Sequence, residues 1–180
     1  SIGRGFATIY STIVRGTPMM VQGLLIYYAG FTVLRGMGFE TAQANQIWST
    51  FTAGLVTISL NSTAYMMEVL RGGIESIPAG QYEAANVLGY TKAQTFLRII
   101  LPQVVKRVMP SVTNEVVTLV KDTSMAFTVS YQEMFTIGKQ IANSQTSFTP
   151  FLVAGVFYFV FNAIVDFVMG KIEKRMDYYK

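Results

Sequence analysis

The sequence predicts an all-α fold: a polytopic membrane helical bundle with four visible transmembrane helices and a polar helical hairpin on one side of the membrane. The chain has 180 residues, of which 51% are hydrophobic and only 13% charged, whereas a soluble domain carries about 25% charged residues. It also contains charge-free stretches that are long enough to cross a bilayer, and its positive charges gather on one side of the predicted bundle. We expect residues 1–180 to form a single domain.

Four stretches reach the length of about 20 residues that a transmembrane helix needs. They are residues 16–34, 41–67, 109–131 and 140–165. The first, second and fourth contain no charged residue, and Ile47 to Met67 is the most apolar part of the second. The third is weaker because it contains Glu115, Lys121 and Asp122. Including it lets the loops alternate between the two sides of the membrane.

The first predicted span follows Arg15-Gly-Thr17-Pro18. Proline has no backbone N–H and restricts the residue before it, so these residues mark either a kink or the true start of the membrane helix. The preceding GFATIYSTIV is either the first part of a bent helix or an interfacial helix. We expect Arg15 at the cytoplasmic end of the span, where its side chain can reach water.

The distribution of Lys and Arg predicts the orientation, because cytoplasmic loops are enriched in both. Ten of them fall on one predicted side and two on the other. The ten are Arg4, Arg71, Lys92, Arg98, Lys106, Arg107, Lys171, Lys174, Arg175 and Lys180. We therefore expect the loop from residue 68 to residue 107 and the C-terminus to be cytoplasmic.

That loop is expected to contain two short helices. Pro78 is a helix-start signal, and the good helix formers from Ala79 to Leu88 are followed by Gly89, which ends the first helix. Thr91 and Gln94 fit a capping box for a second helix, which is expected to end at Leu101 because Pro102 follows. Leu97, Ile99 and Leu101 are expected to anchor the second helix to the membrane domain.

Polar residues of the third span share one side of a helix. At 100° per residue, Ser111, Asn114, Glu115, Thr118, Lys121 and Asp122 fall within an arc of about 120°. Ionisable groups at membrane depth cost at least about 2.5–3.5 kcal/mol each on insertion scales, so this arc must face protein or a water-filled cavity.

Two interpretations of the arc remain open, and intramembrane charges favour the second. Either Lys121 pairs with Asp122 or Glu115 and the cluster holds the bundle together, or the arc lines a solute pathway. In the pathway, the two carboxylates could hold an ammonium group and Lys121 a carboxylate, which is consistent with a zwitterionic solute. Asn61 and Ser62 either mediate helix packing or line the same cavity.

The hairpin carries a recognisable motif. Glu83-Ala84-Ala85, Gly89, Ile99 and Leu101-Pro102 occur at a spacing that resembles, without a gap, the EAA motif of ABC importer permeases. In that family the loop, here about residues 72–107, couples the membrane helices to a cytoplasmic ATPase subunit. The resemblance therefore implies that these residues contact the ATPase and transmit its movement.

Further stretches resemble the polar amino-acid branch of the same family: RGTPMMVQ, ISLNSTAYMMEVLRGGIESIPAGQ and NEVVTLVKDTSMAF. Members of this branch usually have five spans with the N-terminus outside. Only four are visible here, so the resemblance implies a fifth span upstream of Ser1. It also implies a bacterial-type plasma or inner membrane as the location of the protein.

The leading hypothesis is thus the permease subunit of an ATP-driven importer for a polar amino acid. The chain has no GxxxxGK[ST] phosphate-binding loop, so ATP and Mg²⁺ are expected on separate ATPase subunits. Further expected partners are a second permease subunit, identical or homologous, an extracytoplasmic amino-acid-binding protein and membrane lipid, but no nucleic acid. With no Cys and no His, we expect no catalytic residue and no metal site.

Two alternative hypotheses explain less of the sequence. An ion-coupled secondary transporter would explain the intramembrane charges equally well, but it leaves the hairpin unexplained. A non-transporting membrane protein explains neither the polar arc nor the hairpin.

Overall fold

The computed structural model describes residues 2–124 and 131–175, which form helices joined by short connections and contain no strand within those ranges. The elements are α1 (Ile2–Gly16), α2 (Met19–Gly36), α3 (Thr41–Ile47), α4 (Thr50–Glu75), α5 (Ala79–Val87), α6 (Lys92–Gln94), the π-helical turn η1 (Thr95–Ile100), α7 (Leu101–Asp122), α8 (Met134–Gln145) and α9 (Thr149–Arg175). The all-α prediction is confirmed.

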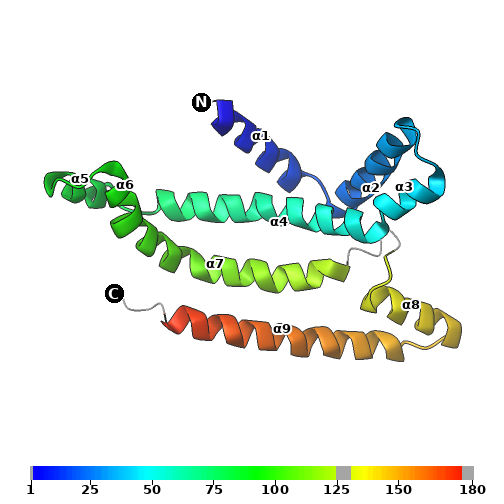
Figure 1. The fold of residues 1–180 in the computed structure, drawn as a ribbon. Helices are drawn as coiled ribbons and strands as arrows, with labels where there is room; N and C mark the ends of the chain where they lie inside the picture. The colour runs from blue at the N-terminus through cyan, green and yellow to red at the C-terminus, as the bar shows by residue number, and fades with distance from the viewer. Residues whose placement is uncertain (1, 125–130, 176–180) are drawn as a thin grey trace.

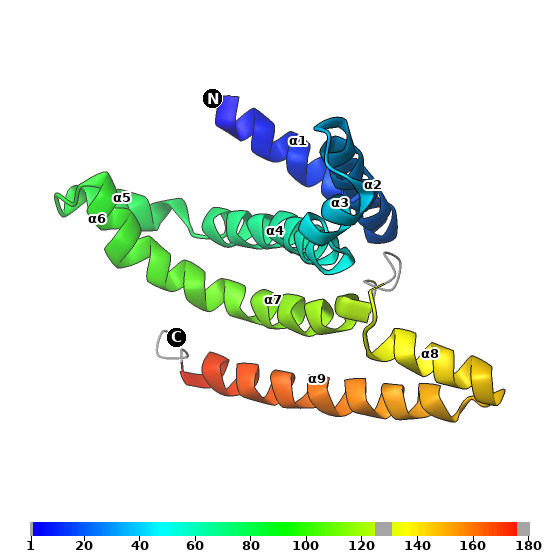
Figure 2. The ribbon, with the colours of Figure 1, turned by 45° about the vertical axis from the view of Figure 1, so that its right-hand side comes forward.

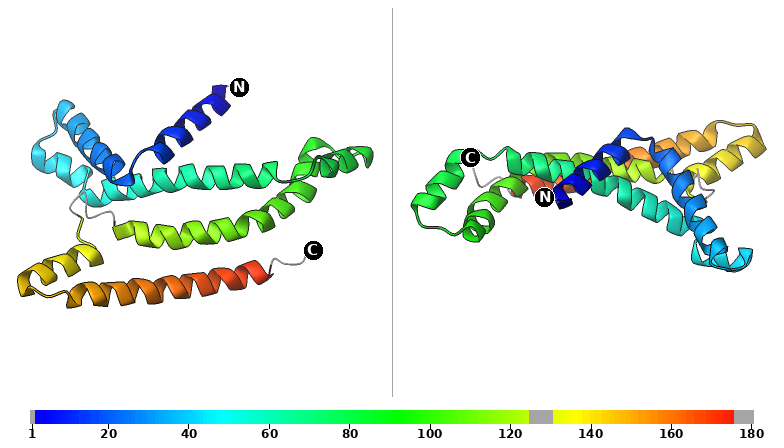
Figure 3. Two further views of the ribbon diagram at one scale, coloured as in Figure 1. Left: turned by 180° about the vertical axis from the view of Figure 1, so that it is seen from behind. Right: turned by 90° about the horizontal axis from the view of Figure 1, so that it is seen from above.

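Three long helices form the body of the bundle (Figure 1). α4, α7 and α9 lie side by side and alternate in direction, with α7 packed against both of the others. The short helices α5 and α6 project beyond one end of this layer, near the end of α9, while α3 and α8 lie at the opposite end (Figures 2 and 3). Both α1 and α2 pack against α4.

Length and hydropathy alone qualify few of the described helices as membrane spans. Thr149–Arg175 is long and apolar enough to cross, and the bent pair formed by Gly5–Gly16 and Met19–Gly36 would add a second if it makes one span. α4 has 26 residues, about 39 Å at 1.5 Å per residue, against a hydrocarbon core of about 30 Å. It reaches the required length but is too polar for the hydropathy criterion.

Two predicted spans have different boundaries in the structure. The stretch 41–67 is not one helix: α3 ends at Ile47, and a new N-terminus forms where Ser49 Oγ accepts the Thr52 N–H at 3.1 Å. Likewise, 140–165 includes the turn between α8 and α9, where Thr146 adopts a left-handed conformation with φ 48°. The serine cap and the left-handed turn each interrupt the backbone hydrogen bonding of a helix. The prediction relied on the absence of charged residues, which does not show such interruptions.

The prediction that the second hairpin helix ends before Pro102 is wrong. α6, η1 and α7 follow one another without a break, and Pro102 lies in the first turn of α7. The Leu101 N–H bonds to the Phe96 carbonyl, five residues back, so a wider π turn precedes the proline, which cannot donate a backbone hydrogen bond. Of the predicted span 109–131, α7 covers the part up to Asp122, and residues 125–130 lie outside the described residues.

The chain bends sharply at Thr17-Pro18. The axes of the helices before and after this point differ by 111°, and Pro18, in an extended conformation, caps α2. α1 is thus a separate helix rather than the straight beginning of α2. The break lies beside Asn61 and Tyr65, near the middle of α4, and the placement of Arg15 at the cytoplasmic end of a span stays a prediction.

One side chain satisfies the backbone groups that the break exposes. Gln22 Nε2 donates to the Val14 carbonyl at 2.7 Å and to the Thr17 carbonyl at 2.9 Å, while its Oε1 accepts from Asn61 Nδ2 at 3.1 Å. These three hydrogen bonds fasten the break and join it to α4.

Candidate functional site: a protruding hairpin and a polar pocket

The predicted hairpin is present between α4 and α7. α5 ends where Gly89 adopts φ +76°, and the Tyr90 N–H returns to the Ala85 carbonyl at 3.0 Å. Thr91 and Gln94 then form the predicted capping box at the start of α6. Gly89 is at the corner because a Cβ is strained in this left-handed conformation.

The exposed tip of the hairpin differs from the predicted contact set. Glu83 and Ala84 are exposed, but Ala85 is 1% exposed and therefore packs inside the hairpin. Val87 and Leu88 are 86% and 72% exposed, which makes them the most accessible apolar side chains of the tip. These two residues were not predicted as contacts, although an apolar pair directly before a turn glycine is a visible signal.

The apolar root of the hairpin also differs from the prediction. Leu97 and Leu101 are 60% and 36% exposed, so neither is an anchor, whereas Ile100 is fully buried. Ile100 belongs to a core cluster completed by Ile77, Val104 and Val108, and Ile99 packs against it from a partly buried position. The buried side of this segment is therefore marked by Ile100, with Ile99 at its edge, and not by the two leucines.

Polar contacts reinforce this root. Arg107 Nη1 donates to the Ser76 carbonyl, and also lies 3.2 Å from Ser76 Oγ, so α7 is tied to the end of α4. Gln103 Nε2 donates to Gln81 Oε1 at 3.2 Å and to the Ile99 carbonyl at 2.8 Å. The hairpin is therefore fixed to two long helices by both apolar and polar contacts.

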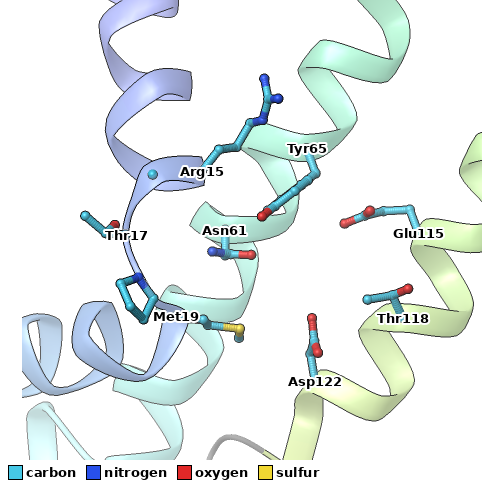
Figure 4. Close-up of a pocket in the computed structure, with 10 residues that line it drawn as sticks. Arg15, Thr17, Met19, Asn61, Tyr65, Glu115, Thr118 and Asp122 are labelled. Carbon is cyan, nitrogen blue, oxygen red and sulfur yellow. The ribbon is translucent and has the colours of Figure 1, made fainter.

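A polar pocket of about 480 Å³ lies between the α1–α2 break, α4 and α7 (Figure 4). Its volume falls within the range of about 300–1,000 Å³ that is typical of small-molecule sites. The lining residues are Arg15, Gly16, Thr17, Pro18, Met19, Asn61, Tyr65, Glu115, Thr118 and Asp122. Three separate segments of the chain thus meet around one cavity.

Only some of the residues predicted to line a solute pathway line this pocket. Asn61, Glu115, Thr118 and Asp122 line it, and their side chains face one another across it (Figure 4). The remaining three predicted residues, Ser62, Asn114 and Lys121, are not among its lining residues.

Other features of the pocket were not foreseen. Arg15, Thr17 and Tyr65 line the pocket but were not predicted there, because the break was expected at the membrane edge. Within residues 2–124 and 131–175, no ion pair joins Lys121 to Glu115 or Asp122.

The charges of the pocket are arranged by sign. Glu115 and Asp122 come from α7, whereas Arg15 comes from the end of α1 on the other side of the cavity (Figure 4). Asn61 and Thr118 add neutral hydrogen-bonding groups. Among the described residues, no group of three or more Asp and Glu side chains is placed to hold a metal ion. The arrangement is suited to a small solute that carries both a positive and a negative group.

A helical bundle with a polar pocket between its helices and a helical hairpin projecting from one end is the arrangement expected of a membrane transport subunit. Residues 1–178 match the family described as binding-protein-dependent transport system inner membrane component. The chain belongs to this family.

Relatives with named functions agree with this assignment. The chain is 37% identical over 175 residues to the putative glutamine transport system permease protein GlnP of Rickettsia conorii, covering 96% of this chain and 75% of that protein. It is 36% identical over 165 residues to the octopine transport system permease protein OccM of Rhizobium radiobacter, covering 88% and 64%.

A solved structure has the same fold. It is described as the crystal structure of an amino acid ABC transporter with histidines, and it matches with a TM-score of 0.78 and 30% identity, covering 93% of this chain and 74% of that one. The prediction of an ABC-type permease is confirmed, and the ion-coupled alternative finds no support in these relatives.

Proposed function

We propose that this chain forms the translocation pathway for a polar amino acid in an ATP-driven importer of a prokaryotic cell membrane. The observation that carries the proposal is the separation of charge across the pocket. Arg15 would bind the carboxylate of the solute, while Glu115 and Asp122 would bind its ammonium group or a cationic side chain. Asn61 and Thr118 would orient the solute by hydrogen bonds.

The hairpin would connect this pocket to a cytoplasmic ATPase subunit, which holds ATP and Mg²⁺. Glu83 and Ala84 are exposed for contact, and the apolar Val87 and Leu88 at the tip suit insertion into a groove of the partner. The buried Ile100 at the root would transmit movement of the tip to α4 and α7. Ala85, Gly89, Ile99 and Pro102 would hold the shape of the hairpin, while Leu101, which is 36% exposed, would be free to contact the ATPase.

Orientation and assembly are part of the proposal. The hairpin and the end of α9 lie at the same end of the bundle (Figure 1), which supports placing both in the cytoplasm. Asn114 and Lys121 are exposed on α7, and such groups are disfavoured against lipid. We therefore place a second permease subunit against this edge, and an extracytoplasmic amino-acid-binding protein at the opposite end of the bundle.

Co-purification with the ATPase, followed by reconstitution with the binding protein, tests this function. Solute-stimulated ATP hydrolysis across a panel of amino acids should identify one polar class and leave apolar amino acids inactive. Uptake that continues without ATP but collapses with the ion gradient would instead support a secondary transporter.

A further inference from the structure

A second cavity adjoins the solute pocket. Its volume is about 270 Å³, and it lies between α1 and the second half of α4. Its lining residues are Ala7, Thr8, Ser11, Thr12, Arg15, Met67, Glu68 and Arg71. Arg15 is the residue that this cavity and the solute pocket have in common, so the surroundings of Arg15 in the second cavity bear on its position in the first.

Glu68 is the centre of the polar contacts in the second cavity. Its Oε1 accepts from Ser11 Oγ at 2.9 Å, and its Oε2 accepts from Arg71 Nε at 3.1 Å and from Arg71 Nη2 at 2.7 Å. The same Oε2 lies 3.5 Å from Arg15 Nη1. One carboxylate therefore contacts two positions on α1 and one on α4.

These contacts differ in strength. Arg71 makes the short hydrogen bonds to Glu68 and pairs with Glu75 at 3.4 Å as well. The Arg15 pair is longer than a hydrogen bond, and the Arg15 side chain is 45% exposed. Glu68 thus attracts Arg15 without occupying its donors fully, and guanidinium N–H groups stay available to a ligand.

We propose that Glu68 is a positioning residue that holds Arg15 at the edge of the solute pocket, where the guanidinium binds the carboxylate of the solute. This inference rests on the proposed function, because it assigns a purpose to Arg15 in amino-acid binding. A purely structural role is the competing explanation, since the bond from the buried Ser11 to Glu68 would also clamp α1 onto α4. A variant that removes the charge of Glu68 but keeps its hydrogen bond to Ser11 distinguishes the positioning role from the structural role.

Glu68→Gln makes that separation. The amide retains an oxygen for Ser11 but loses the charge that attracts Arg15. Glu75→Gln is the matched control, because it removes the other acidic partner of Arg71 on the same helix face without a contact to Arg15. Ser11→Ala is the reverse variant, which removes the clamp and leaves the charges of Glu68 and Arg15 in place.

Direct binding to the permease–ATPase complex in nanodiscs, without the external binding protein, provides the measurement. The ligands are L-glutamine, L-arginine and L-histidine, each compared with its carboxamide by titration calorimetry. For whichever amino acid binds, Glu68→Gln should raise Kd about fivefold, as expected for a partly exposed charge contact, while the Kd of the carboxamide stays the same. Glu75→Gln should alter neither, and Ser11→Ala should lower Tm without changing the acid-to-amide ratio.

The outcomes distinguish the two proposals. If none of the three amino acids binds the wild-type complex, the pocket assignment fails and the positioning role fails with it. If binding is normal but Glu68→Gln leaves Kd unchanged, lowers it, or raises it equally for acid and amide, the pocket stands and the positioning role is overturned. If the Gln variant does not assemble, Glu68→Asp replaces it, because it keeps the charge but shifts it by one methylene. Glu68→Asp should also raise the Kd of the amino acid and not that of its carboxamide. An unchanged Kd of the amino acid in this variant also overturns the proposal.

Discussion

Gly73 is a position where α4 closely approaches α7, and Gly73→Ala should destabilise the bundle. A Cβ built on Gly73 would overlap Val108 Cγ1 and would lie 3.3 Å from Val104 Cγ1. Neither valine has room to move away, because Val104 and Val108 are 2% and 6% exposed. They also belong to the core that carries the hairpin, so the change reaches the root of that element.

The neighbouring Gly72 supplies a control that isolates the packing effect. No atom lies within 4 Å of a Cβ built there, so Gly72→Ala gains only the helix preference of alanine, about 1 kcal/mol. Gly73→Ala gains the same preference but also overpacks the core, which costs about 1–3 kcal/mol. Gly73→Ala should therefore be less stable than Gly72→Ala by about 1–3 kcal/mol, or about 2–12 °C in Tm on the scale of soluble proteins of this size.

Thermal unfolding of both variants in nanodiscs, measured under identical conditions, tests this difference. Val108→Ala removes the overlapping methyl group, so the double variant with Gly73→Ala should be more stable than the sum of the two single changes predicts. Equal Tm values for Gly72→Ala and Gly73→Ala would refute the close approach of α4 and α7 at this point. If the effects of Gly73→Ala and Val108→Ala on stability are strictly additive, Val108 is not the residue that a Cβ at position 73 would overlap.

The remaining predictions concern function. Gly89→Val should abolish solute-stimulated ATP hydrolysis while the protein still inserts, because a β-branched residue at φ +76° is strained by about 1–2 kcal/mol. Gly89→Asn should retain activity, and a valine variant with normal solute-stimulated ATP hydrolysis would contradict a role of the hairpin in coupling. Glu83→Lys should weaken co-purification of the ATPase more than Glu83→Gln does, and unchanged recovery of the ATPase with both would argue against contact there. Asp122→Asn should raise the Kd for the solute about tenfold with Tm unchanged, whereas lower Tm with normal affinity would indicate a structural carboxylate.

The sequence was sufficient for those parts of the fold that depend on local chemistry. The helix from Ala79, the turn at Gly89 and the capping box at Thr91 follow from residues within a few positions of each other, and all three are present. The end at Pro102 was mispredicted because a preceding π turn makes the missing N–H tolerable. That turn has no compositional signature, and neither does the burial of Ile100 in place of Leu101.

The pocket was predictable along one helix but not across helices. Helical spacing on α7 placed Glu115, Thr118 and Asp122 on one face, and these three line the cavity. Arg15 was missed because its part in the pocket depends on where the α1–α2 break meets α4, which is a tertiary property. Nothing in the local sequence specifies that a proline break lies at the middle of a neighbouring helix rather than at its end.

The amide that bridges the break makes position 22 unusually intolerant of near-isosteric replacement. Gln22 Nε2 serves three oxygens, those of the Val14 and Thr17 carbonyls and Thr17 Oγ1, with two hydrogens, while Oε1 accepts from Asn61. Glutamate has the same shape, but its carboxylate would face those oxygens without a proton to share. Asparagine keeps the chemistry but is shorter by one methylene. Among variants of similar size, glutamine is therefore the side chain that combines the necessary reach with both a donor and an acceptor.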